Sequence, residues 1–421
     1  MRGGLSYFLL FVILFILAID IYSFRGVRIL TSSLDSWLRL TIHIVYWLIP
    51  VVIFLLMIFT SLQLKLVMTS QKFRIWYFMM GMFVLFYVPK IVFMTFQLGN
   101  DLIQGLGFLL TKMSTSGSRV ANTASVMSRA EFLTRAGILV AAIPFLSVLQ
   151  GITSGRYNYK IKNLRLVFQN LPTAFNGLRI VQISDWHIGS FLGQGDKVRK
   201  AVDMINAQEP ELILFTGDLV NNIAEEVSEF IPELKRLKAR YGIFSILGNH
   251  DYGEYVSWES TEKHQENMER LFQYEQRCGF RLLRNESVVL ERDGEKIGLA
   301  GVENWGLPPF PQYADLQQSM NNIKNLPFKI LMSHDPSHWD AEVLGNSDID
   351  LTLSGHTHGM QFGINIPGLK WSPVKWRYPR WAGLYSEGNK KLYVNVGIGY
   401  IGFPGRVGFL PEITVFELSN S

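Results

Sequence analysis

The stretch LRIVQISDWH, residues 178–187, decides the fold of the C-terminal two-thirds of this chain. Its first seven residues are mostly apolar and predict a buried strand. Asp185 and His187 follow this strand directly, with Trp186 between them. A carboxylate and an imidazole at the end of a strand are residue types that bind metals or carry out acid–base chemistry.

Four more polar clusters follow apolar runs in the same way. The runs cover residues 211–216, 243–247, 328–332 and 349–353. The clusters after them are Gly217-Asp218, Gly248-Asn249-His250-Asp251, Ser333-His334-Asp335 and Gly355-His356-Thr357-His358. Together the five clusters supply Asp, Asn and His side chains at five strand ends, which is what a dinuclear metal site requires.

The segments between the first three clusters have helical periodicity. Residues 197–207 place four apolar side chains on one face, and residues 227–238 also predict a helix. The strands are nearly continuous in apolar residues, as parallel strands covered on both faces are. This β-α-β-α-β succession predicts an α/β domain whose ligands gather at the carboxyl ends of the strands.

The rest of this domain predicts a second group of strands. Residues 287–290 and 296–300 predict a hairpin around the Asp-Gly turn at 293–294. Residues 391–396 and 412–418 predict closing strands. We therefore expect two packed sheets with helices outside and all five polar clusters along one rim.

The first 150 residues differ in composition from the rest. The chain has 421 residues, 48% of them hydrophobic, and a mean hydropathy of +0.16, and the apolar excess lies in the N-terminal third. We expect three to four transmembrane helices over residues 1–150, a loop over residues 111–128, and a catalytic domain over residues 151–421. Crossing a bilayer takes ~20 apolar residues. Three stretches reach this length: Leu5–Phe24, Ile42–Leu62 within Trp37–Leu66, and Ile75–Leu98. A shorter fourth candidate is Ala136–Leu149.

Several residues of this region carry expectations of their own. The aliphatic part of Lys90 is expected to extend through the apolar layer so that its ammonium group reaches a lipid headgroup. His43 is expected to form an interhelical hydrogen bond. Residues 102–110 are too short to span and are expected to lie at the interface. Residues 128–133 resemble a twin-arginine export signal with Ala130 in place of the second arginine, whereas the Lys and Arg residues of the loops favour neither side. We expect a bacterial cell membrane and leave the side of the catalytic domain open.

Composition also excludes some functions. The net charge of +5 and the pI of about 9.1 suit a protein beside anionic lipid. The sequence has no block of Lys and Arg and no nucleic-acid signature, so no nucleic-acid partner is indicated. The single cysteine, Cys278, excludes an internal disulfide and a cysteine-based zinc site, and we expect it to pack as a small apolar residue.

In order and approximate spacing, the motifs D-x-H, G-D, G-N-H-D, S-H-D and G-H-T-H resemble those of the calcineurin-like metallophosphoesterase superfamily. The resemblance runs from Leu178 to the C-terminus. It implies a four-layer α/β/β/α sandwich with two divalent metal ions, and Mn, Fe or Zn suit its oxygen and nitrogen donors. Membrane-attached bacterial phosphodiesterases look most similar, by the features Gly397-Ile398-Gly399, Pro404, Arg406, Pro411 and Glu412.

The resemblance also implies roles for individual residues. His250 would act as a general acid or electrostatic partner to the leaving-group oxygen. A water held between the two ions would lose its proton near neutral pH and give a metal-bridging hydroxide as the nucleophile. The ligands of one ion would be Asp185, His187 and His358, those of the other Asn249, His334 and His356, and the bridging ligand Asp218.

Other residues near the motifs leave alternatives open. Asp251 either orients His250 or caps the turn, and Asp335 either supports a ligating histidine or is an ordinary loop carboxylate. Arg406 either binds a substrate phosphate or forms a salt bridge with a carboxylate such as Glu412.

Three further expectations concern surfaces. Residues 397–399 are expected to line the substrate side, and His264 and His338 are expected to be solvated. Residues 369–381 contain three Trp, one Tyr and four cations. This segment is either an interfacial membrane contact or a set of aromatic side chains packed under a long loop.

The combined pattern predicts a membrane-anchored dimetal phosphoesterase that hydrolyses a phosphodiester or pyrophosphate bond. Its partners would be the lipid bilayer and a phosphoester substrate, with a phospholipid or a nucleotide-linked lipid as candidates. One alternative is a phosphomonoesterase of the same superfamily. The other is a non-catalytic membrane scaffold or sensor, which the complete ligand set disfavours.

Overall fold

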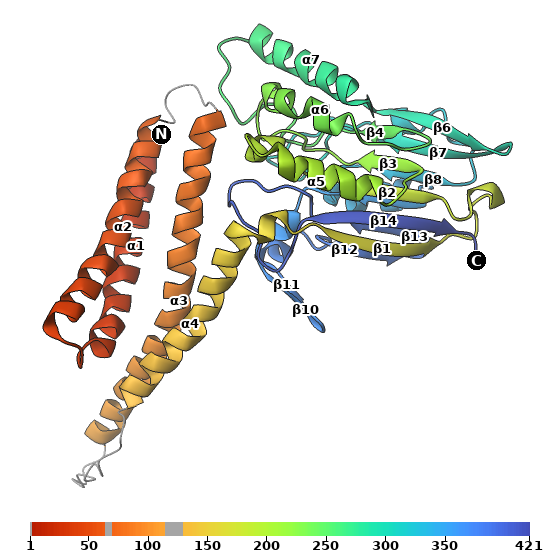
Figure 1. Cartoon of the computed structure of the whole chain (residues 1–421). Coiled ribbons are helices and arrows are strands. Elements are labelled where there is room, and N and C mark those ends of the chain that lie inside the picture. The colour runs from red at the N-terminus through yellow and green to blue at the C-terminus, as the bar shows by residue number, and fades with distance from the viewer. Residues whose placement is uncertain (1, 64–69, 114–128) are drawn as a thin grey trace. The chain divides into compact units, whose positions relative to one another are not determined.

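The computed structural model describes residues 2–63, 70–113 and 129–421 (Figure 1). The chain divides into two compact units, which are considered separately below. One unit comprises Met1–Leu66 and Phe78–Gln150, and the other Val67–Tyr77 and Gly151–Ser421. The loop predicted over residues 111–128 falls largely outside the described residues.

The N-terminal region is helical, as its apolar runs predict. Three of its helices are long and apolar enough to cross a membrane, over Ser36–Phe59, Ile75–Leu110 and Ala130–Thr153. This confirms an all-α membrane region ahead of the catalytic domain. The helices are α1 (Arg2–Leu30), α2 (Ser36–Gln63), α3 (Ser70–Met113) and α4 (Arg129–Thr153).

The third helix is longer than the sequence pattern indicates. Residues 102–110 continue α3, and their place at the interface stays a prediction. Pro89 lies inside this helix and does not end it. In an apolar environment a proline removes one backbone hydrogen bond, whereas ending the helix would leave many more polar groups without partners.

A buried ion pair lies inside the membrane unit. Lys90 Nζ lies 2.5 Å from Asp20 Oδ1, and the Tyr87 hydroxyl donates to Asp20 Oδ2 at 2.8 Å. The Tyr46 hydroxyl donates to the Asp20 backbone carbonyl at 2.7 Å. The expectation that Lys90 reaches a lipid headgroup is therefore wrong, because its charge is neutralised by a carboxylate 70 residues earlier.

The other expected polar contact of this unit is confirmed. His43 Nε2 lies 2.9 Å from the Thr31 hydroxyl, which joins α2 to the end of α1. Phe24 of α1 also packs edge-on against the His43 ring, with 4.9 Å between ring centroids. His43 is thus an interhelical hydrogen-bond partner.

The catalytic unit contains two six-stranded sheets (Figure 1). In the order of hydrogen bonding, the first sheet consists of β1 (Lys160–Val167), β14 (Glu412–Ser419), β2 (Arg179–Ile183), β3 (Leu212–Phe215), β4 (Ile243–Ser245) and β5 (Phe280–Leu282). The second consists of β12 (Gly383–Glu387), β13 (Lys390–Val394), β9 (Leu351–Ser354), β8 (Lys329–Met332), β7 (Glu295–Gly301) and β6 (Glu286–Arg292).

Helices cover the outer face of each sheet. The first sheet carries α5 (Gly195–Asn206), α6 (Ile231–Leu234) and α7 (Thr261–Cys278). The second carries α8 (Leu316–Met320), α9 (Leu344–Asn346) and a π-helical turn, Trp339–Val343. Short 3-10 turns are η1 (Gly155–Tyr157), η2 (Thr173–Phe175), η3 (Ile188–Phe191), η4 (Ala224–Phe230), η6 (His358–Gln361) and η7 (Pro373–Trp376).

The apolar core lies in three layers between these elements. Along β2, Ile180 packs toward the second sheet, whereas Val181 packs toward the helices, as the alternation of side chains in a strand requires. Ile330 and Leu351 meet Ile180 in the layer between the sheets. The four-layer α/β/β/α sandwich is therefore confirmed.

Two local predictions have different outcomes. The hairpin of β6 and β7 forms with both turn residues, Asp293 and Gly294, at positive φ, as the Asp-Gly pair predicts. Residues 227–238 do not form one helix: η4 ends at Phe230 and α6 begins with Pro232 in its first turn. Proline has no backbone N–H to continue the preceding turn, but it is favoured where a helix starts.

A third sheet was not predicted. It is a separate two-stranded antiparallel hairpin of β10 (Ile364–Ile366) and β11 (Leu369–Trp371). Gly368 supplies a positive φ of 80° in its turn. Its strands have only three residues each, which is too short for an alternating pattern to be visible in the sequence.

Replacing Asp20 by Ala tests the ion pair in the membrane unit. The variant leaves the Lys90 ammonium without its partner, and we expect a loss of about 3–5 kcal/mol in the free energy of unfolding. The double variant D20A/K90A removes both charges and is expected to be more stable than D20A. Thermal unfolding of the detergent-solubilised protein measures both effects.

The control for this experiment is R135A. It breaks the exposed pair that Arg135 forms with Glu131 in α4, and such pairs contribute little. A D20A protein that unfolds at the temperature of R135A would contradict a stabilising role for the buried pair.

Candidate metal centre

Five loops from the two sheets meet at one rim of the catalytic unit. Three of them follow β2, β3 and β4 of the first sheet, and two follow β8 and β9 of the second. Each loop begins where its strand ends, so that the polar clusters come together as the strand order requires. The side chains they bring together are Asp185, His187, Asp218, Asn249, His334, His356 and His358, and all are buried or nearly so.

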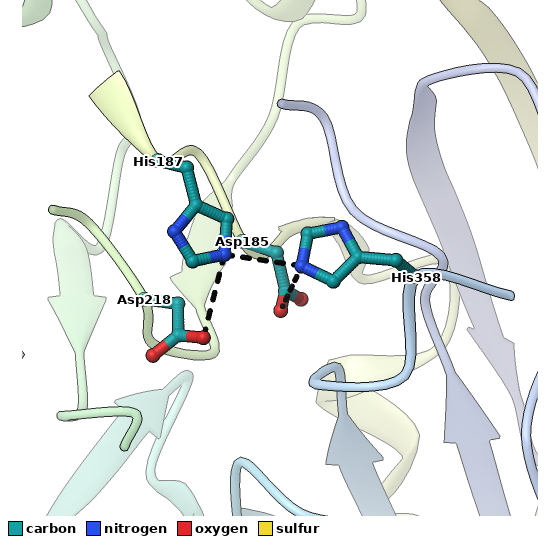
Figure 2. Close-up of side chains that lie close together, drawn as sticks. All are labelled: Asp185, His187, Asp218 and His358. Carbon is teal, nitrogen blue, oxygen red and sulfur yellow. Dashed lines mark hydrogen bonds and ion pairs between the residues drawn. The ribbon is translucent and has the colours of Figure 1, made fainter. Parts of the chain in front are cut away.

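The first group of side chains holds two carboxylates and two imidazoles. In Asp185, His187, Asp218 and His358, one ligand atom from each lies within 4.8 Å of the others (Figure 2). His358 Nε2 lies 3.0 Å from His187 Nε2 and 3.2 Å from Asp185 Oδ1. Two nitrogen and two oxygen donors that converge in this way fit a divalent cation.

The second group surrounds the other side of Asp218. His334 Nε2 lies 3.2 Å from Asp218 Oδ2, and His356 Nδ1 lies 2.8 Å from Asn249 Oδ1. His187 Nε2, from the first group, lies 3.5 Å from the same Asp218 oxygen. Asp218 is thus placed between the two groups, where a bridging ligand would have to be.

Hydrogen bonds determine which ring nitrogen of two histidines is available. His187 Nδ1 lies 3.1 Å from the Val220 carbonyl, and His334 Nδ1 lies 2.7 Å from the Thr216 carbonyl. A carbonyl can only accept, so Nδ1 carries a hydrogen in both rings, and Nε2 is the nitrogen that faces the cluster. His334 Nε2 is buried and makes no hydrogen bond of good geometry. A metal ion would satisfy this nitrogen.

His356 is held the opposite way round. Its Nε2 lies 2.8 Å from the Tyr378 hydroxyl and 3.4 Å from Asp335 Oδ2, which leaves Nδ1 facing Asn249. The Asn249 amide in turn donates from Nδ2 to the Tyr255 hydroxyl at 2.8 Å, so that its oxygen faces the cluster. Asp335 thus lies beside His356, and its support of a ligating histidine stays a prediction.

Tyr378 is a residue that sequence reasoning missed. It lies in the aromatic segment 369–381 and is almost fully buried. Nothing in its local sequence marks it, because its contact with His356 joins two segments that pack together only in the fold.

The backbone at the cluster is unusual. Five of the seven side chains belong to residues in the left-handed region, with φ between 46° and 70°: Asp185, His187, Asp218, His356 and His358. This conformation costs about 1–2 kcal/mol for each non-glycine residue. Contacts between loops offset it, as where the His356 backbone N–H donates to the Asp185 carboxylate at 3.0 Å.

Glycine is required beside the central carboxylate. Gly217 has a φ of 93°, and a Cβ at this position would lie 2.6 Å from the Gly248 nitrogen. Both residues precede a cluster member, Asp218 and Asn249. Their lack of a side chain lets the β3 and β4 loops approach closely enough to share the cluster.

Asp251 caps the loop of Asp218. Its carboxylate accepts the backbone N–H groups of residues 218–220 and of Gly248, at 2.8 to 3.1 Å. No hydrogen bond to His250 is found among the residues that the structure describes. Of the two alternatives for Asp251, the cap is the one observed.

Arg406 does not lie where a substrate phosphate could reach it. Its guanidinium is fully buried and donates to the carbonyls of Val396, Gly397 and Gly399, while Nη2 lies 3.2 Å from His358 Nδ1. The expected phosphate contact is therefore corrected: Arg406 braces the backbone behind a cluster histidine. Among the residues that the structure describes, Arg406 forms no salt bridge either, and Glu412 pairs with Lys162.

The glycines of residues 397–399 also lie behind the cluster. A Cβ on Gly397 would lie 2.8 Å from Asp185 Cβ, and Gly399 packs against the Trp186 backbone. The expectation that this run lines the substrate side is wrong. The run instead lets the chain pass close to the β2 loop.

The two remaining histidines differ from the expectation of solvated side chains. His338 is fully buried, with Nδ1 2.8 Å from the Ser333 hydroxyl and Nε2 3.1 Å from Glu342. Its ring stacks on Trp305. His264 is half-buried, and its Nε2 contacts the Tyr252 carbonyl. Neither ring belongs to the cluster.

The electrostatics of the cluster favour a cation. Burial raises the pKa of Asp218, but His334 and His250 outweigh it and hold this pKa well below its usual range. Burial lowers the pKa of His334, but Asp218 outweighs it and raises this pKa to about 10. The carboxylate therefore stabilises positive charge at its side, whether a proton or a metal ion supplies it.

Comparison with known proteins gives two matches to family models. The model described as "Probable Calcineurin-like phosphoesterase, transmembrane domain" matches residues 2–156. The model described as "Calcineurin-like phosphoesterase" matches residues 178–360, which contain all seven side chains of the cluster.

Several curated proteins are similar to this chain. The uncharacterized metallophosphoesterase YkuE of Bacillus subtilis is 33% identical over 60% of this chain and 82% of that protein. A transmembrane protein with metallophosphoesterase domain from Danio rerio is 28% identical over 68% of this chain and 63% of that protein. The uncharacterized metallophosphoesterase Cj0846 of Campylobacter jejuni is 31% identical over 62% of this chain and 64% of that protein. The match thus covers less than two thirds of the last two proteins.

Replacing Tyr378 by Phe removes one hydroxyl and keeps the ring. Because this hydroxyl holds His356 Nε2, we expect the affinity of the cluster for Mn²⁺ to fall about 10–100-fold. Equilibrium dialysis with Mn²⁺ measures the effect without any assay of activity. The matched control is Y313F, which removes a hydroxyl bonded to Glu254 outside the cluster. Equal Mn²⁺ affinity of Y378F and Y313F would show that Tyr378 does not position His356.

Proposed function

This chain belongs to the calcineurin-like metallophosphoesterases, and from that premise we propose that its catalytic unit hydrolyses a phosphodiester or pyrophosphate bond. The family membership makes it a membrane-associated metallophosphoesterase. The observation that carries the finer proposal is the convergence of seven ligand-type side chains around Asp218, with no position filled by an unsuitable residue. A non-catalytic scaffold would have no need of this complete set.

Two divalent ions fit the donors of the cluster. Its oxygen and nitrogen atoms, with no thiolate, suit Mn, Fe or Zn. When bound, such ions supply Lewis acidity and activate water for attack on phosphorus. The proposed ligands of one ion are Asp185, His187 and His358, those of the other Asn249, His334 and His356, with Asp218 shared.

His250 is proposed as the residue that serves the leaving group. Its Nδ1 donates to the Asn221 carbonyl at 2.7 Å, and its backbone N–H donates to Asp218 Oδ1 at 2.9 Å. Within the part of the chain that the structure describes, His250 Nε2 makes no hydrogen bond. The ring is therefore oriented beside the cluster, and in the imidazolium form its Nε2 would carry the proton for a departing oxygen.

The membrane region supports a lipid as the substrate. A chain that is integral to a membrane meets phosphoesters in lipids at high local concentration, and phospholipids and nucleotide-linked lipids both carry the proposed bond. The bacterial relatives support a bacterial cell membrane as the location. A phosphomonoesterase is the competing activity, and the experiment below separates the two.

Hydrolysis of model esters by the detergent-solubilised full chain tests the proposal. We expect cleavage of bis-p-nitrophenyl phosphate in preference to p-nitrophenyl phosphate, dependent on Mn²⁺ and abolished by chelator. The control variant D218N lacks the shared carboxylate charge and is expected to lose bound metal and activity together. Preference for the monoester would replace the phosphodiesterase by the phosphatase. No cleavage of either by metal-loaded protein would contradict both.

Replacing His250 by Ala separates its role from that of the ligands. We expect kcat to fall about 10²–10⁴-fold, the usual contribution of a general acid, while the metal content stays near that of the wild type. Metal analysis beside the diester assay provides both numbers. H264A, which changes a histidine outside the cluster, is the control. A parallel loss of metal in H250A would make His250 a ligand instead.

A further inference from the structure

The catalytic unit exposes a cluster of large apolar side chains on and around the β10–β11 hairpin. Met360, Ile364, Ile366, Leu369 and Trp376 are exposed to 56%, 44%, 58%, 48% and 76%. We call these five residues the hairpin patch. Figure 1 shows β10 and β11 projecting away from the two large sheets. Single exposed apolar residues are ordinary, but five large ones within residues 360–376 indicate a contact surface.

The hairpin has no core of its own. In its register Ile364 pairs with Trp371, and Ile366 pairs with Leu369, so apolar side chains stand opposite each other on both strands. All residues of the two strands are exposed except the half-buried Trp371. A two-stranded hairpin of this length is at best marginally stable in water. The exposed apolar residues of the hairpin thus indicate that it is stabilised by contact with an apolar partner and not by water.

The charges beside the patch are of one sign. Residues 360–381 contain four cations and no acidic residue. Arg380 pairs with Asp340 and Glu387. Lys375 and Arg377 remain exposed on either side of Trp376. Tryptophan flanked by cations is typical of the headgroup region of a membrane, where the indole ring and the positive charges are both stabilised.

From these observations we propose that the hairpin patch inserts into the headgroup layer of the bilayer that this chain spans. The chain carries its own candidate transmembrane helices, and residues 154–159 alone separate α4 from β1, so the catalytic unit is tethered to a bilayer by a short link. The absence of acidic residues from the segment suits an anionic lipid surface. Both alternatives for segment 369–381 then apply to different residues. Leu369 and Trp376 belong to the membrane contact, whereas Tyr378 and Trp381 are packed in the protein.

The patch is connected to the metal cluster at both of its ends. Met360 follows the cluster residue His358 by two positions, and Tyr378 follows Trp376 by two and contacts His356 Nε2. Insertion of the patch therefore brings the cluster beside the phosphates of lipid headgroups. Resting on the proposed function, the inference assigns the hydrolysed bond to a lipid headgroup and not to a soluble phosphoester.

Site-directed fluorescence in proteoliposomes tests insertion without using activity. The only native thiol, Cys278, is buried, and C278A provides the background for single new cysteines. I366C on the hairpin and E269C on the exposed face of α7 are labelled with the fluorophore NBD in the full chain. The vesicles contain phosphatidylcholine with phosphatidylglycerol and nitroxide-labelled lipid. We expect nitroxide quenching and protection from iodide at residue 366, and the reverse at residue 269.

Each outcome decides the proposal. Equal iodide quenching at the two positions would overturn it, and so would shielding of residue 366 without nitroxide quenching, which would indicate a second copy of the chain on the patch. If insertion is found but metal-loaded protein cleaves no phosphoester, the proposed function fails while the membrane contact stands.

A second variant links insertion to substrate. I366N/L369N/W376N keeps the chain length and changes only exposed side chains. We expect hydrolysis of vesicle phospholipid to fall about tenfold or more, because three apolar anchors are lost, while soluble bis-p-nitrophenyl phosphate is cleaved at the wild-type rate. Equal rates on vesicles for the variant and the wild type would show that the patch does not deliver the cluster to lipid.

Discussion

The Asp185 carboxylate accepts the backbone N–H of His356. This contact joins the loop after β2 of the first sheet to the loop after β9 of the second, at the rim where the cluster of seven side chains lies. Beneath it, Gln182 of β2 donates to the Ser354 carbonyl of β9 at 2.9 Å. Because the cluster draws side chains from both sheets, it exists only when the sheets are packed. The apolar layer between them is thus a condition of the chemistry as well as of stability.

The sequence was sufficient for the strands that carry the polar clusters and for which side chains gather at their ends. Both follow from local pattern, since an apolar run such as 178–184 predicts a buried strand and the residue after it must lie at the strand end. What could not be predicted depends on contacts distant in sequence. The burial of Arg406 against backbone carbonyls, the Tyr378 contact with His356 and the pairing of Lys90 with Asp20 each require knowledge of the packed chain.

The cluster is arranged before any substrate arrives. Carbonyls orient His187 and His334, Tyr378 orients His356 in the opposite sense, and Asp251 holds the loop of Asp218 through three of its backbone amides. Left-handed residues are tolerated here because these contacts determine the backbone more strongly than local preference does. Folding thus places the ligand atoms of the cluster in advance, so that substrate binding does not have to organise them.

The pairing of β1 with β14 has a consequence for synthesis of the chain. β1 ends at Val167 and β14 begins at Glu412, so the ribosome makes 244 intervening residues before the first strand meets its neighbour. At about 5–20 residues per second this takes roughly 10–50 s. Throughout that time the strand that pairs with β1 has not been made. The charged residues Lys160, Lys162 and Arg165 of β1 disfavour its pairing with strands of other nascent chains during this time.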